Sequence, residues 1–84
     1  MTLEMMAVKD RALNAFMRPW FAQSTGQAIR MFQDEINNKQ GELSKHPDDY
    51  DLWHLATFSD HTGHLELPEG GIKQLAIGKQ LVKE

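Results

Sequence analysis

Positively charged and aromatic side chains follow one another closely in the first quarter of the chain, where Trp20 and Phe21 come directly after several basic residues. Proteins that hold single-stranded nucleic acid without sequence preference place cations along the phosphates and aromatic rings against the bases. We therefore consider a nucleic-acid contact here, joined by two cations from the middle of the chain. The candidate residues are Lys9, Arg11, Arg18, Trp20, Arg30 and Lys45.

The same side chains also have a purely structural interpretation. Trp20 and Phe21 could close the hydrophobic core against a helix while the nearby cations are simply solvated, since tryptophan is usually largely buried. Trp53 and His54 point to opposite faces if they lie on a strand, so they cannot form one pocket. Trp53 therefore fits a core or a dimer interface better than a base-stacking site. Residue types alone favour the structural interpretation.

Histidine pairs could ligate a metal ion. His61 and His64 are three residues apart, and imidazole with carboxylate ligands suits zinc or nickel. However, the pair flanks an expected turn, and no third ligand stands at a standard spacing. We expect no metal site and no cofactor.

Serine and aspartate side chains also fail to form a catalytic pattern. Ser24 and Ser44 lack a nucleophile signature. Asp48, Asp49 and Asp60 could be imagined as the magnesium ligands of a nuclease, but they lie beside a proline and in a tight turn, where aspartate bonds to the local backbone. We expect no catalytic residues and no enzyme activity.

Length and charge limit the class of protein. The 84 residues allow one domain, residues 1–84, and the absence of cysteine excludes disulfides and thiolate zinc sites. Nine Lys and Arg against twelve Asp and Glu give a net charge of −3, which disfavours wrapping of duplex DNA through phosphates alone. No apolar run has the length of a membrane span, and charges interrupt the first 20 residues. We expect a soluble intracellular protein.

The chain before residue 42 predicts two strands and a helix. Residues 3–8 and 13–18 fit a hairpin that turns at 9–12, although one helix over 3–17 is an alternative that Met, Leu and Ala favour. Ser24 fits a helix N-cap with Gln27 reaching back, and apolar residues then recur at helical spacing. A helix at 25–40, ended by a left-handed Gly41, is expected.

A second pair of strands follows. Residues 50–58 alternate so that Tyr50, Leu52, His54, Ala56 and Phe58 share one face, with large apolar groups on the other face too. We expect this strand to be central and covered on both sides. A turn at 60–63 leads to a return strand at 65–67, and residues 72–82 fit a strand, a short helix, or one after the other.

These elements predict an α+β domain, with one helix packed across a small, mostly antiparallel sheet in the order β-β-α-β-β plus a C-terminal segment. The burial energy of so few large side chains only modestly exceeds the ordering entropy of so short a chain. An open sheet of this size also exposes its edges. We therefore expect a homo-oligomer, with a dimer as the first candidate.

Four sequence blocks resemble a known family. Residues 18–22, 26–32, 45–52 and 58–63 are similar, in the same order and at similar spacing, to the small non-structural protein of gokushovirus-type microviruses, which are single-stranded DNA phages. The resemblance covers about residues 13 to 67. It matches less well in the N-terminal ten residues and after Pro68.

The resemblance implies a protein that acts in the infected host cytoplasm and is absent from the virion. Such proteins are treated as DNA-binding or replication-associated, and their proposed task is the change from duplex replication to single-strand synthesis and packaging. The resemblance supplies no catalytic residues. DNA, single-stranded more than duplex, is thus the expected partner. The alternative is a non-catalytic adaptor that binds a phage replication initiator, a host replication component or the procapsid.

Overall fold

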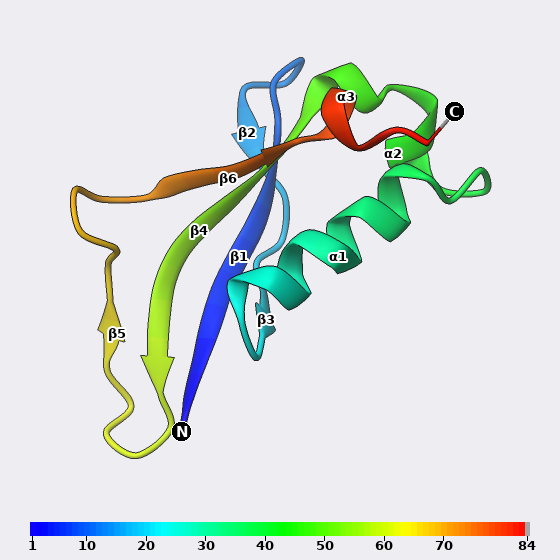
Figure 1. The fold of residues 1–84 in the computed structure, drawn as a ribbon. Coiled ribbons are helices and arrows are strands. Elements are labelled where there is room, and N and C mark those ends of the chain that lie inside the picture. Colours follow the sequence, from blue (N-terminus) through cyan, green and yellow to red (C-terminus); the bar gives the residue numbers. More distant parts are fainter. Residues whose placement is uncertain (84) are drawn as a thin grey trace.

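Within residues 1–83, which the computed structural model describes, six strands form one antiparallel sheet whose two longest strands lie side by side at its centre (Figure 1). The two long strands are β1 and β4; β2 and β3 both pair with β1, whereas β5 and β6 both pair with β4. Their bounds are β1 (Thr2–Asp10), β2 (Ala15–Phe16), β3 (Trp20–Ala22), β4 (Tyr50–Ser59), β5 (Leu65–Glu66) and β6 (Lys73–Ile77).

The N-terminal hairpin is confirmed, and the alternative helix over 3–17 is wrong. The turn lies later than expected, at residues 11–14, because the Asp10 carboxylate accepts the backbone N–H groups of Ala12 and Leu13 at 3.0 and 3.3 Å. The returning chain forms two short strands instead of one, since Pro19 between them has no N–H to donate to β1.

Within residues 1–83, one helix crosses the sheet, and three single helical turns accompany it. Ser24 caps α1 (Thr25–Ile36) as predicted: its Oγ accepts the Gln27 N–H at 3.1 Å, while Gln27 Oε1 accepts the Gln23 N–H at 2.7 Å. The bounds of the short turns are α2 (Glu42–Lys45), η1 (Pro47–Asp49) and α3 (Gly78–Leu81).

The main helix ends four residues earlier than predicted. Asn37 stops α1 because its side-chain amide donates to the carbonyls of Gln33 and Leu81, at 2.8 and 2.9 Å. This bond ties the end of α1 to α3 from the other end of the chain. Gly41 is not a left-handed terminator; it has φ −94° and precedes α2.

The hydrophobic core lies between α1 and one face of the sheet. Ala28, Phe32 and Ile36 recur every four residues along α1 and pack against sheet residues that include Met6 and Leu52. The fold is thus α+β, a mostly antiparallel sheet with a helix packed across it, as the sequence predicts. Of the three possibilities for residues 72–82, the structure has the third, a strand followed by a short helix.

A bulge in β4 changes which residues share a face. Met5 pairs with Ala56 and Met6 with His54, so Leu55 is an extra residue in β4. As a result His54 and Thr57 both reach the Glu4 carboxylate on the helix side, whereas Ala56 lies on the opposite side. The predicted common face of residues 50, 52, 54, 56 and 58 is therefore wrong after residue 54.

Candidate nucleic-acid interface

The face of the sheet opposite α1 is rich in aromatic and aliphatic side chains, and we call it the open face. Cross-strand pairing places Phe16 opposite Lys9, Phe21 opposite Met5, and Phe58 opposite Leu3 and Leu65. Exposed fractions of 42%, 47% and 56% at Phe16, Phe21 and Leu65 show that the described chain leaves much of this face uncovered. By strand pairing the open face includes Leu3, Met5, Ala7, Lys9, Phe16, Phe21, Trp53, Ala56, Phe58 and Leu65, and also the buried carboxylate of Asp51 directly opposite Lys9.

Four rings of the open face form two aromatic pairs. Phe16 meets Trp53 edge to face, with ring centroids 6.2 Å apart and an interplanar angle of 82°. Phe21 meets Phe58 at 5.9 Å with an angle of 59°. Trp53 and Phe58 pair with Ala7 and Leu3 of β1, which are four residues apart, so the two aromatic pairs are separated by about 13 Å along the strand. Ring faces left uncovered can stack on flat ligands.

A cation stands at one end of this aromatic surface. The Nζ of Lys9 lies 5.6 Å from the centroid of the Phe16 ring, within cation–π range. Because Lys9 is cross-strand to Phe16, its ammonium and the first aromatic pair belong to one surface. The arrangement could hold a planar base and neutralise an adjacent phosphate.

The structure shows a different role for Arg11. Its Nε lies 3.3 Å from Oδ2 of Asp51, whose side chain is 4% exposed, and its Nη2 donates to the Asp48 carbonyl. The other oxygen of Asp51 is buried and has no partner within residues 1–83. Removing Arg11 would leave a buried carboxylate without its cation, which is destabilising. An Arg11→Ala variant would therefore report on folding as well as on any phosphate contact.

Trp20 and Phe21 lie on opposite faces of β3. Trp20 packs against the core beneath α1, as the structural interpretation of the sequence favoured. Phe21 does not close the core, because it lies half-exposed on the open face. Alternation along a strand separates the two neighbours, so they cannot form one stacking surface.

The other predicted cations are dispersed. Arg18 is exposed in the connection between β2 and β3, Arg30 is exposed on α1, and Lys45 of α2 lies 3.5 Å from Glu42. Of the six candidates, only Lys9 is placed on the open face by strand pairing. The sequence reasoning missed Phe16 and Phe58 and assigned Trp53 to a core or a dimer interface. The bulge in β4 is what places Trp53 and Phe58 on the same face.

Polar groups on the helix side form a small network. His54 Nε2 lies 2.9 Å from the Glu4 carboxylate, and the Thr57 hydroxyl donates to the same oxygen at 2.6 Å. His61 and His64 are both exposed in the loop between β4 and β5. Nowhere in the described range do three histidine or carboxylate side chains come together in a way that could hold a metal ion.

Tyr50 gives a spectroscopic test of this side of the sheet, because it is the single tyrosine of the chain. Burial, and then the charges of Asp10, Glu42 and Asp49, raise its pKa above the ordinary value of 10.0. The folded state favours the neutral phenol, so this stabilisation is present below pH 10 and is lost as the pH rises through the folded pKa.

We expect the phenolate absorbance of the native protein to rise with a midpoint above pH 10.0. The absorbance of the protein unfolded in urea should rise with a midpoint close to pH 10.0. Asp10→Asn should lower the native midpoint, because Asp10 lies directly opposite Tyr50 in the β1–β4 pair. A native midpoint at or below that of the unfolded chain would contradict the partly desolvated, acidic surroundings of the phenol.

Within residues 1–83, the fold and the open face define a small α+β protein with an aromatic, partly exposed surface on one side of the sheet and α1 packed on the other side. The chain belongs to the phage ORF5 protein family, whose model matches residues 3–79. Neither the search of curated proteins nor the search of solved structures found a match. No helix within residues 1–83 is long and apolar enough to cross a membrane.

Proposed function

We propose that this phage protein binds single-stranded DNA on the open face. The observation that carries the proposal is the surface formed by the Phe16–Trp53 and Phe21–Phe58 pairs with Lys9 beside Phe16. Base stacking on aromatic side chains contributes about 1–3 kcal/mol per base and tolerates any sequence. Duplex DNA keeps its bases stacked inside the helix, so its bases are not available to such a surface.

The resemblance to gokushovirus-type microvirus proteins supports the biological setting of the proposal. In that setting the protein acts in the host cytoplasm during phage replication, at the change to single-strand synthesis and packaging, without catalysis. The net charge of −3 is consistent with a contact dominated by stacking. Each phosphate contact to a single strand changes the slope of log K against log salt by about −0.7, so with Lys9 as the main cation we expect a shallow slope of about −1.

A fluorescence-anisotropy titration tests this function. A labelled oligothymidine should bind at low salt with the shallow slope given above, and an unlabelled duplex of equal length should compete poorly. Equal competition by the duplex would contradict the single-strand preference. Lack of binding to either DNA at low salt would overturn the proposed function.

Self-association is a second possible use of the open face. The sequence predicts a homo-oligomer, and burial of Phe16 and Phe21 against a second copy would remove apolar surface from water. Sedimentation across a range of concentrations, with and without oligothymidine, separates the two uses. A dimer that dissociates when DNA binds shows competition for one face, whereas a dimer that binds DNA unchanged uses another surface.

A further inference from the structure

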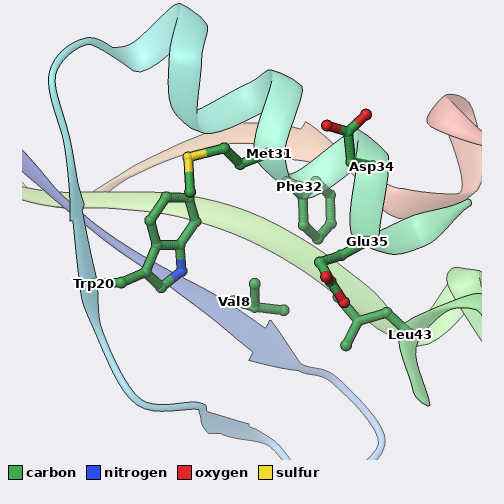
Figure 2. Close-up of a pocket in the computed structure, with 7 residues that line it drawn as sticks. All are labelled: Val8, Trp20, Met31, Phe32, Asp34, Glu35 and Leu43. Carbon is green, nitrogen blue, oxygen red and sulfur yellow. The ribbon is translucent and has the colours of Figure 1, made fainter. Parts of the chain in front are cut away.

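A cavity of about 300 Å³ opens on the helix side of the molecule, between α1 and the strands β1 and β3 (Figure 2). Val8, Phe32 and Leu43 form an apolar base, and Trp20 and Met31 stand at one end. This volume is at the lower limit for ligand pockets and corresponds to one large side chain rather than an extended ligand. The open face lies on the other side of the sheet, so the cavity is independent of the proposed DNA contact.

Two acidic residues stand at the end of the cavity opposite Trp20: the Glu35 carboxylate lies beside Leu43, and the Asp34 carboxylate points away from the apolar base (Figure 2). Asp34 and Glu35 are consecutive residues of α1, line the cavity and are exposed to solvent. Neither takes part in an ion pair with the rest of residues 1–83. An apolar base with an unpaired acidic rim fits an apolar group that carries a positive charge beside it, and it repels phosphates.

We propose that this cavity docks a protein partner through an exposed peptide segment in which a large apolar side chain is followed by lysine or arginine. The apolar side chain enters the cavity over Phe32 and Leu43, where its burial removes apolar surface from water. The cation then lies beside Asp34 and Glu35, which gives the site its selectivity by charge complementarity. A protein partner on this face and DNA on the open face could be bound at the same time.

Three capped tetrapeptides, Gly-Phe-X-Gly with X as lysine, norleucine or glutamate, test the proposal because they share the phenylalanine and carry a positive, a neutral or a negative side chain at one position. The readout is the indole N–H signal of Trp20 in a ¹H–¹⁵N NMR titration, assigned with the Trp53→Phe variant. We expect the lysine peptide to shift this signal saturably and to bind about fivefold more tightly than the norleucine peptide, since one exposed charge pair at contact distance contributes a factor of that order. The glutamate peptide should bind most weakly.

The double variant Asp34→Asn/Glu35→Gln should bind the lysine and norleucine peptides equally, while the exposed Asp48→Asn control should keep the preference. Equal binding of all three peptides by the natural chain, or no shift of the Trp20 signal with any of them, would overturn the proposal. Phenethylammonium, which has an aromatic ring and a cation but no peptide backbone, distinguishes a peptide site from a site for small amines. If it binds as tightly as the lysine peptide, a protein partner is contradicted. Phe16→Ala/Phe21→Ala should leave peptide binding unchanged, so failure here is distinct from failure of the DNA proposal.

Discussion

Gly78→Ala should lower the melting temperature by about 4–24 °C, since overpacking costs about 1–3 kcal/mol and each kcal/mol shifts a domain of this size by about 4–8 °C. Gly78 is buried at the start of α3, where three parts of the chain meet. A Cβ there would lie 2.5 Å from the Pro47 carbonyl oxygen, 2.8 Å from the Tyr50 carbonyl oxygen and 2.8 Å from Ile36 Cδ1. Two of the three clashes are with backbone, which cannot rotate away.

Thermal and urea unfolding followed by circular dichroism measure this effect. Gly26→Ala is the matched control, because its Cβ would meet only Ser24 Oγ at 3.9 Å and alanine favours a helix over glycine. Adding Ile36→Val to Gly78→Ala relieves the side-chain clash alone and should restore little stability. A Gly78→Ala protein that melts within about 2 °C of the natural chain would show that α3 does not pack against η1 and β4 as described.

Phe16→Ala and Phe21→Ala should each weaken oligothymidine binding about tenfold, and the double variant should weaken it about a hundredfold. Each substitution removes one ring of an aromatic pair, and loss of one stacked base costs about 1–3 kcal/mol. Both rings are close to half-exposed, so their loss should affect folding less than that of a buried ring. Anisotropy titrations at one fixed low salt concentration measure the loss.

Met31→Ala is the control for the aromatic variants. Met31 is 45% exposed, like the two phenylalanines, but lies on α1 away from the open face. Its removal should leave DNA affinity unchanged.

Lys9→Ala should instead reduce the salt slope by about 0.7 while keeping most of the stacking. Unchanged DNA affinity in the Phe16→Ala/Phe21→Ala variant would exclude the open face as the DNA site, and loss of self-association in the same variant would assign that face to a second copy.

Local patterns in the sequence determined the elements of this protein. The cap at Ser24, the start of α1 and the strand from Tyr50 were predictable because each depends on hydrogen bonds or periodicity within a few consecutive residues. The α+β class followed from their order. The early end of α1 was not predictable, because Asn37 bonds to Leu81, which is 44 residues away.

Only the tertiary structure decided which side chains lie together on each face of the sheet. The extra residue Leu55 in β4 reverses the alternation along that strand, so pairing with β1 decides that Phe58 joins Phe21 on the open face. Arg11, a plausible phosphate ligand in the sequence, is held by Asp51 across the sheet. The faces of a sheet depend on strand register between distant segments, and no periodicity within one strand contains that information.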